Sequence, residues 1–72
     1  MTESIFTKNY KYFLTKLKKA RLEANFTQFD VAKIIKKPQS FISKCESGER
    51  RVDIAELKIF AEIYKKKIDF FI

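Results

Sequence analysis

The stretch TQFDVAKIIKKPQSFISKCESG, residues 27–48, contains the clearest structural pattern of this chain. It opens with Thr27, a good helix-capping residue, and Asp30 follows three positions later, as in a capping box. The spacing predicts a helix over residues 28–36, since apolar side chains then recur on one side at the helical period. These side chains belong to Val31, Ala32 and Ile35.

A second short helix follows the pair Lys36-Lys37, which we expect to form the turn. Pro38 suits a first helical turn and Gly48 suits the residue that ends a helix, so the second helix is predicted over residues 38–47. Two short helices joined by so tight a turn indicate a helix-turn-helix unit over about residues 27–47.

The second of these helices has two unlike faces. At about 100° per residue, its apolar residues gather on one side: Pro38, Phe41, Ile42 and Cys45. The opposite side carries short hydrogen-bonding side chains: Gln39, Ser40, Ser43, Lys44 and Ser47. Helix surfaces that meet only water usually carry pairs of Glu and Lys instead. The composition of this face therefore raises the question of what it contacts.

Further helices are expected on both sides of this unit. A first helix begins near Lys8 and stops at Asn25, because Asn tolerates the left-handed conformation that ends helices. Asp53 and Glu56 form a second capping-box pair at the start of a fourth helix, and a final helical turn covers residues 68–72. The predicted core faces are Tyr10, Phe13, Leu14, Leu17, Ala20 and Ala24 in the first helix and Ile54, Leu57, Ala61 and Tyr64 in the fourth.

Length and composition allow one small domain of the all-α class. The chain has 72 residues, of which 46% are hydrophobic, so a compact core is feasible. A single Gly and a single Pro disfavour an all-β fold, which needs turn residues every few positions. We therefore interpret residues 1–72 as a single domain.

The charge balance suits an anionic partner. Sixteen Lys and Arg against nine Asp and Glu give a net charge of +7 and a pI near 9.7, which fits nucleic acid or a membrane surface, although solvated lysine-rich helix faces account for part of the excess. No apolar run approaches the roughly 20 residues of a membrane span, and no signal peptide is visible. A single Cys excludes an intramolecular disulfide, so we expect a cytoplasmic location.

Residues suited to catalysis or metal binding are scarce. The chain has no His, and its one thiol, Cys45, falls on an apolar helix face, where it is expected to be a small core residue. Without His or a pair of Cys residues, a zinc site is disfavoured. The sequence thus disfavours an enzyme and indicates no cofactor, no metal and no small-molecule ligand.

These segments resemble the phage repressor and Cro-type helix-turn-helix regulators, also called the xenobiotic-response-element family. The matching stretches are LKKAR (17–21), TQFDVA (27–32), KPQSFISKCESGERR (37–51) and AEIYKKKIDFF (61–71), and the likeness covers about residues 13–71. The resemblance implies a compact five-helix bundle of the lambda-repressor-like type with a central helix-turn-helix. The chain departs from the family at Lys65 and Lys67, where Gly and Ser or Thr are common, and at Val52, where Pro is frequent.

The resemblance also implies that the polar face of the helix over 38–47 enters the major groove of DNA. Gln can bind adenine through two hydrogen bonds, Ser can bind several base edges, and Lys can bind guanine or phosphate. The residues expected to contact bases are Gln39, Ser40, Ser43 and Lys44.

Other residues are expected to contact the phosphate backbone. Gln28 stands at a helix N-terminus, where backbone N–H groups favour a phosphate. The family's glutamine at this position contacts phosphate and steadies the recognition helix, so the resemblance implies both roles for Gln28. Lys37, Arg50 and Arg51 flank the recognition helix and are the other candidate phosphate contacts, which would set register and affinity rather than sequence choice.

Arg21 and Glu46 are assigned to structure. Each lies at the margin of an apolar stripe, where an unpaired charge is costly. The family pairs the matching residues between its first and third helices, so the resemblance implies an ion pair between them.

Surplus apolar surface in the C-terminal part, about residues 54–72, predicts a homodimer, because a soluble monomer seldom leaves such a surface bare. The predicted interface consists of Ile59, Ile63, Phe70, Phe71 and Ile72. The alternative is that the N-terminal segment folds back through Ile5 and Phe6 and covers this surface.

The predicted function is sequence-specific transcriptional regulation by a homodimer on a palindromic operator, nucleoid-associated when bound to double-stranded DNA. The short length favours a restriction-modification controller protein or a small autorepressor. An antitoxin on the same fold and a protein-interaction module are the alternatives. A membrane-binding role is disfavoured, because the apolar stripes are interrupted by caps and turns.

Overall fold

A computed structural model describes residues 5–72, which form four α-helices, a single 3₁₀ turn and no strand within that range. The elements are α1 (Ile5–Glu23), α2 (Gln28–Ile35), α3 (Gln39–Ser47), α4 (Ile54–Tyr64) and η1 (Ile68–Phe71). The all-α prediction is confirmed at this level. The expected fifth helix is a 3₁₀ turn rather than an α-helix, so a count of five α-helices is not confirmed.

Both predicted capping boxes are present. The Thr27 hydroxyl accepts a hydrogen bond from the backbone N–H of Asp30 at 3.0 Å, and the Asp30 carboxylate accepts one from the Thr27 N–H at 2.8 Å. Asp53 and Glu56 repeat this reciprocal arrangement at the start of α4, at 2.8 and 3.0 Å. Because each box satisfies N–H groups that have no partner inside the helix, it determines where the helix begins.

The helix ends rely on residues in the left-handed conformation. Asn25 has φ of 64°, as its place after the first helix predicts, and Gly48 has φ of 88° after α3. Lys36 and Lys65 adopt the same conformation after α2 and α4, with φ of 59° and 56°. Lys65 therefore adopts the conformation for which the family commonly uses glycine at this position, and its backbone is strained.

Two helix starts differ from expectation. α1 begins at Ile5, three positions before Lys8. α3 begins at Gln39, because Pro38 is still extended, with φ of −63° and ψ of 154°, and stands as the N-cap rather than the first helical residue. Proline supplies the φ of a helix here but not the helical ψ.

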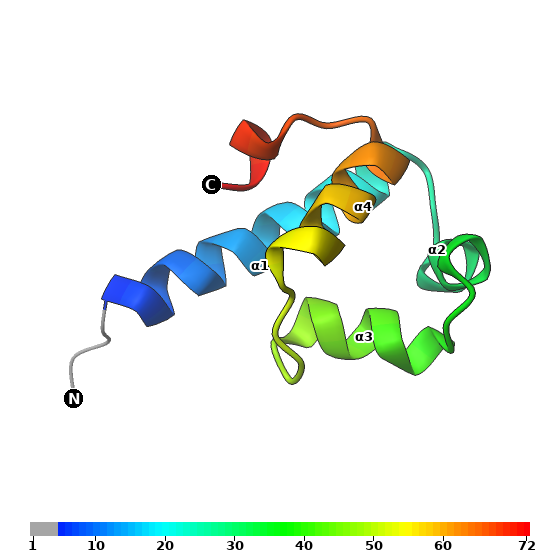
Figure 1. The fold of residues 1–72 in the computed structure, drawn as a ribbon, viewed down its shortest axis with the longest axis horizontal. Coiled ribbons are helices and arrows are strands. Elements are labelled where there is room, and N and C mark those ends of the chain that lie inside the picture. The colour runs from blue at the N-terminus through cyan, green and yellow to red at the C-terminus, as the bar shows by residue number, and fades with distance from the viewer. Residues whose placement is uncertain (1–4) are drawn as a thin grey trace.

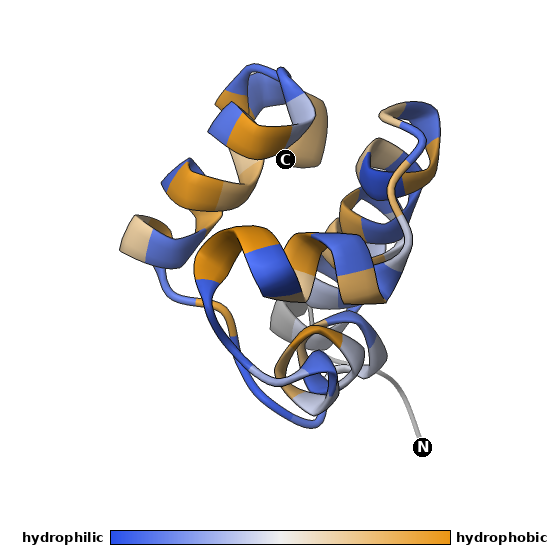
Figure 2. Cartoon of the chain, turned by 90° about the vertical axis from the view of Figure 1, so that its right-hand side faces the viewer, coloured by the Kyte–Doolittle hydropathy of each residue, from blue (hydrophilic) through white to orange (hydrophobic). Residues whose placement is uncertain are grey.

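α1 is the helix around which the others pack. It contacts α3 on one side and α4 and η1 on the other, while α2 packs against α3 (Figure 1). Apolar and polar residues alternate along the helices, as Figure 2 shows with α2 nearest the viewer, and the apolar sides meet in one core. Its members are Phe13, Leu17, Ala20, Val31, Ala32, Ile42, Cys45, Leu57, Phe60, Ala61, Tyr64 and Phe71.

The prediction for the core face of α4 was partly wrong. Ile54 is 65% exposed, because it occupies the first position of the helix, at the rim of a groove rather than over α1. Phe60 takes its place in the core with 2% exposed, and its ring stacks on Tyr64 with centroids 6.0 Å apart.

The last turn closes the core. Phe71 is completely buried, with its ring 6.2 Å from that of Phe13 on α1 and 5.3 Å from that of Phe70. The prediction that Phe71 belongs to a dimer interface is therefore wrong, because η1 folds back over α1 and uses this ring inside the chain (Figure 1). Ile72, the next residue, is 75% exposed.

Candidate nucleic-acid interface

The polar face of α3 lies on the outside of the molecule. Ile42 and Cys45 are buried on its inner side, whereas its outer side is exposed along the length of the helix. The four residues predicted to contact bases all lie on that exposed side: Gln39, Ser40, Ser43 and Lys44. In Figure 1, α3 runs along the lower edge of the fold, away from α4 and η1.

The angle between α2 and α3 is held by a close crossing. Val31 and Ala32 of α2 are buried, and the small side chain of Ala32 lets the second helix approach closely. In the turn, the Lys37 N–H donates to the Ala32 carbonyl at 3.0 Å. The two helices are thus a rigid unit, as a helix that reads base edges requires.

A buried ion pair joins α1 to α3. Arg21 Nε donates to Glu46 Oε2 at 2.6 Å and Arg21 Nη2 to Glu46 Oε1 at 3.1 Å, and Nη1 donates to the Phe26 carbonyl at 2.9 Å. The hydrogen bond to Glu46 is the main cause that raises the pKa of Arg21, although burial opposes it. The pair implied by the resemblance is present, and it fixes the C-terminal half of α3 relative to the core.

Gln28 belongs to the same network. Its side-chain amide donates to Glu46 Oε1 at 3.1 Å, so the first residue of α2 is tied to α3. This hydrogen bond is a contact through which Gln28 can steady the recognition helix, as the resemblance implied. The amide nitrogen carries two N–H groups, so the second one and the backbone N–H groups of the first turn of α2 remain as donors.

Arg50 forms an ion pair within the protein, although an unpaired cation was expected here as a phosphate contact. Its Nη1 and Nη2 donate to the two carboxylate oxygens of Glu56 at 2.9 and 2.8 Å, and its guanidinium lies 4.6 Å from the centre of the Phe41 ring. This pairing raises the pKa of Arg50 and lowers that of Glu56. The side chain therefore fastens the loop after α3 to the first turn of α4.

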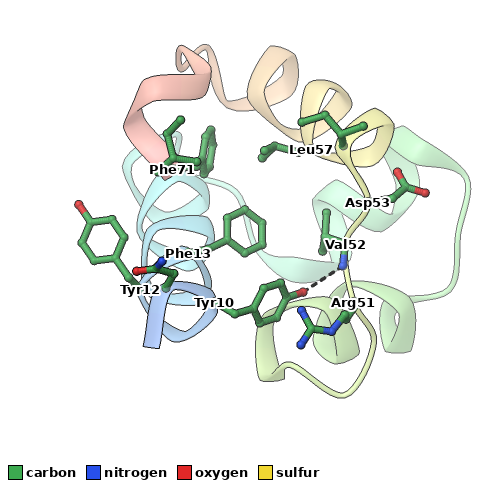
Figure 3. A pocket seen from close by; sticks show the side chains of 11 residues that line it. Tyr10, Tyr12, Phe13, Arg51, Val52, Asp53, Leu57 and Phe71 are labelled. Atoms are coloured by element: carbon green, nitrogen blue, oxygen red, sulfur yellow. Dashed lines mark hydrogen bonds between the residues drawn. The ribbon is translucent and has the colours of Figure 1, made fainter. Parts of the chain in front are cut away.

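Arg51 and Lys37 are exposed and each lies over an aromatic ring. Arg51 is 4.5 Å from the centre of the Tyr10 ring, and the Tyr10 hydroxyl accepts a hydrogen bond from the Val52 N–H at 3.0 Å (Figure 3). Lys37 lies 5.6 Å from the Phe41 ring. Aromatic faces hold cations in this way, so both charges are positioned at the two ends of α3.

Cys45 is fully buried, and burial is the main cause that raises its pKa. A thiol in this state is an unreactive core side chain. Among residues 5–72 no three His, Cys, Asp or Glu side chains are placed to hold a metal ion. None of the described helices combines the length and apolar character needed to cross a membrane.

The residues predicted to form a dimer interface do not form one patch. Ile59, 51% exposed, lines a hollow of about 210 Å³ with Ile35 and Phe41, on the α2 and α3 side. Phe70 lies between the ammonium groups of Lys16 and Lys66, at 4.9 and 4.6 Å from its ring centre.

Ile63 is half-buried against the core, and only Ile72 of the predicted set is on an open apolar surface. That surface surrounds a groove of about 560 Å³ between α1, the segment before α4 and the C-terminal end (Figure 3). Tyr12 and Ile54 are the other exposed apolar residues at its edge. The fold-back of Ile5 and Phe6 concerns side chains outside those that the structure describes.

Comparison with known proteins gives a family match over most of the chain. The helix-turn-helix family HTH_3 matches residues 17–71, which include all of α2, α3, α4 and η1. Searches of curated proteins and of solved structures returned no match. The matched segment contains the exposed polar face of α3, the network that orients it and the tight α2–α3 turn. The chain therefore belongs to the helix-turn-helix family of Cro and xenobiotic-response-element type, whose members are DNA-binding transcription regulators.

Proposed function

We propose that this protein is a sequence-specific transcriptional regulator that inserts α3 into the major groove of a palindromic operator as a homodimer. The observation that carries the proposal is the exposed face of α3, which is polar, nearly free of carboxylates and held rigidly by Arg21 and Glu46. Because the proposed target is DNA, we expect the protein in the cytoplasm, associated with the nucleoid when it is bound. Within this class we propose an autorepressor or a restriction-modification controller.

Base recognition is assigned to the outer side of α3. Gln39 stands at the N-terminal end of the helix and can form two hydrogen bonds with adenine, while Ser40 and Ser43 are short enough to let the helix backbone approach base edges. Lys44 is one helical turn from Ser40 and can reach guanine or a phosphate.

Phosphate contacts are assigned to both ends of this surface. The N-terminus of α2, with Gln28 as its first residue, directs N–H groups outward, and Lys37 and Arg51 supply exposed positive charges. Arg50 contributes less, since its charge is balanced by Glu56.

The homodimer is proposed on the surface around the groove, in place of the C-terminal patch expected from the sequence. Tyr12, Ile54 and Ile72 are exposed there, and a two-fold axis would bury the same surface on both subunits. One short recognition helix reads few base pairs, whereas a dimer places two in successive major grooves about 34 Å apart.

The test begins with selection of bound sequences from a random duplex library by the full chain. We expect a palindromic motif, against which Gln39→Ala and Ser43→Ala should each weaken binding by about 1–3 kcal/mol and relax preference at one base pair. Arg51→Gln is the matched comparison, because loss of a phosphate contact should weaken all duplexes alike and reduce the salt slope by about 0.9.

Thermal melts of all three variants should stay close to the wild type, since these side chains are exposed. If the library yields no motif, the DNA-reading assignment fails and the protein-interaction module becomes the better account. If a motif emerges but Gln39→Ala and Ser43→Ala bind it and a scrambled duplex like the wild type, α3 is not the reading helix.

A further inference from the structure

Tyr10 joins the first helix to the loop that follows the recognition helix. Its hydroxyl accepts a hydrogen bond from the Val52 N–H at 3.0 Å, and the centre of its ring lies 4.5 Å from the guanidinium carbon of Arg51 (Figure 3). Tyr10 and Val52 are 42 positions apart in the sequence. One side chain of α1 therefore contacts both the backbone and a charged side chain of a distant loop.

The ring of Tyr10 is fixed on its inner side by the core. Its centre lies 5.4 Å from that of the buried Phe13 ring, which packs in turn against Phe71. Tyr10 itself is half-buried and packs against the core. The aromatic face that Arg51 meets is thus held in place, whereas the ring of a fully exposed tyrosine would move with its own side chain.

The side of α1 that carries Tyr10 also borders the end of α3. Leu14 follows Tyr10 by four residues, so both side chains lie on one face of the helix. A Cβ atom at Gly48, the residue that ends α3, would lie 3.0 Å from the Leu14 side chain. Arg51 comes three residues after Gly48, so Tyr10 holds it close to the C-terminal end of the recognition helix.

Arg51 differs from its neighbour in what it contacts. Arg50 donates two hydrogen bonds to the carboxylate of Glu56, which balances its charge. The contact described for the guanidinium of Arg51 is an aromatic face, which attracts a cation without neutralising it. Arg51 thus combines a full positive charge with a restricted position, and both properties favour a phosphate contact.

We propose that Tyr10 is a positioning residue for DNA binding, which orders Arg51 before the protein meets the phosphate backbone. The inference rests on the proposed function and adds a residue that lies outside the family match, which begins at residue 17. An exposed arginine loses side-chain freedom when it binds a phosphate, and this loss lowers affinity. The ring reduces the loss because it already restricts the side chain, and the hydrogen bond from Val52 restricts the loop backbone in the same way.

The experiment is a double-mutant cycle in the full chain, since such a cycle isolates the coupling between two residues. Tyr10→Leu is made in the wild type and in Arg51→Gln, and binding to the selected operator and to a scrambled duplex is measured at one fixed salt concentration. In the wild type it should weaken binding to both duplexes by about 2- to 10-fold, because one arginine must then be ordered on binding. In the Arg51→Gln background it should change binding little.

Tyr10→Phe and Tyr12→Leu are the matched variants. Tyr10→Phe keeps the ring and loses the hydroxyl, so its binding should fall between that of the wild type and that of Tyr10→Leu. Tyr12 lines the same groove, but its ring lies beside Lys16. Whatever effect Tyr12→Leu has should therefore be the same with and without Arg51→Gln. The coupling of Tyr10 to Arg51 should persist on a half-site duplex, because their contact lies within one subunit.

A second measurement needs no DNA. In the NMR spectrum of the free protein, the side-chain protons of Arg51 should show the upfield shift that an aromatic face causes. Tyr10→Phe should keep this shift and Tyr10→Leu should abolish it. Both variants should speed the hydrogen exchange of the Val52 N–H relative to that of the Leu57 N–H, which donates to the Asp53 carbonyl inside α4.

An equal loss of binding from Tyr10→Leu in both backgrounds would mean a purely structural effect and would overturn the inference. An unchanged or tighter binding of this variant would overturn it too, as would a coupling that disappears on the half-site duplex. Thermal melts show whether each variant is folded, and if Tyr10→Leu is not, the same cycle is made with Tyr10→Phe, for which a smaller coupling is expected. In all these cases a motif selected by the wild type leaves the proposed function intact, whereas a wild type that selects no motif overturns the proposed function itself.

Discussion

Arg21 shows how a single residue links the core to the recognition surface. Only 6% of it is exposed, yet it keeps its charge because Glu46 and the Phe26 carbonyl accept its hydrogen bonds. Glu46 in turn accepts from Gln28, so α1, the start of α2 and α3 meet at one carboxylate. A change at this position therefore affects both the stability of the fold and the position of α3.

We predict that Arg21→Met lowers the free energy of unfolding by roughly 3–5 kcal/mol, because it leaves the buried Glu46 carboxylate without its cation. The double variant Arg21→Met/Glu46→Leu should recover much of that loss, since it removes both charges together. Part of the loss should persist, because Gln28 and the Phe26 carbonyl then lose a hydrogen-bond partner. Urea unfolding of the wild type, both single variants and the double variant measures the coupling, and additive losses would refute it.

Among the elements, the loop between α3 and α4 is held by an ion pair that lies on its outer side. Arg50 reaches from the end of α3 to Glu56 in the first turn of α4, and Glu56 also accepts from the Asp53 N–H in the capping box. The same carboxylate thus caps one helix and ties down the loop that precedes it. For this reason Arg51, rather than Arg50, is the main phosphate contact that we propose in this loop.

We expect this arrangement to weaken in acid. The hydrogen bond from Arg50 is the main cause that holds the pKa of Glu56 below its ordinary value of 4.5. A lowered folded pKa stabilises the fold fully above about 4.5, and the contribution is lost as pH falls through the lower folded value. Thermal melts between pH 7 and pH 2 should therefore show stability falling below about pH 4.5, as the folded protein takes up protons less readily than the unfolded chain.

Glu56→Gln should reduce the slope of the unfolding free energy against pH by the equivalent of up to one bound proton. Arg50→Met should have the same effect. Glu62→Gln, which changes an exposed acid of the same helix, is the matched control for the loss of one carboxylate that does not bind Arg50. Some dependence must remain in every variant, because the pKa values of Glu23 and Asp30 are also lowered, by Lys66 and by Thr27 respectively. An unchanged profile for Glu56→Gln would mean that the ion pair contributes nothing to the folded state.

In the molecule as a whole, the groove beside α1 brings exposed apolar residues of three segments together. It has a volume of about 560 Å³, and Tyr12, Ile54 and Ile72 are exposed at its edge. The three residues come from α1, α4 and the C-terminal end, so the surface exists only in the folded chain. Arg51, a proposed phosphate contact, lines the same groove, which would bring a two-fold interface close to the DNA.

We predict that the wild-type protein sediments as a dimer at micromolar concentration and that Tyr12→Glu/Ile72→Glu sediments as a monomer. Two buried carboxylates without partners would oppose association strongly. The monomer should retain its fold, because both side chains are exposed, and should lose most of its affinity for the full operator while keeping weak half-site binding.

Ile59→Glu is the control for this prediction, since it places the same charge at an exposed isoleucine on the α2 and α3 side. It should remain dimeric. A monomeric wild type would contradict the homodimer, and a dimeric Tyr12→Glu/Ile72→Glu variant would place the interface elsewhere.

Most helix boundaries and the exposed face of α3 could be predicted from the sequence, because local chemistry determines them. The starts of α1 and α3 are the exceptions. The hydroxyl of Thr27 and the carboxylate of Asp53 cap the helices that follow them, and Asn25 and Gly48 tolerate the backbone that ends a helix. The division of α3 into a buried and an exposed side follows from the helical period alone. These features depend on residues within a few positions of one another.

Which apolar residues stay exposed, and which charged residues lack an ion-pair partner, depends on tertiary contacts. Phe71 and Ile72 are adjacent in an apolar run, yet one is fully buried and the other open, because η1 turns just one of them toward Phe13. Arg50 and Arg51 are adjacent too, but the start of α4 brings Glu56 to the first, and α1 brings the face of Tyr10 to the second. Such outcomes depend on how helices distant in sequence cross. Neighbouring side chains point in different directions, so one meets the core or an ion-pair partner while the next stays at the surface.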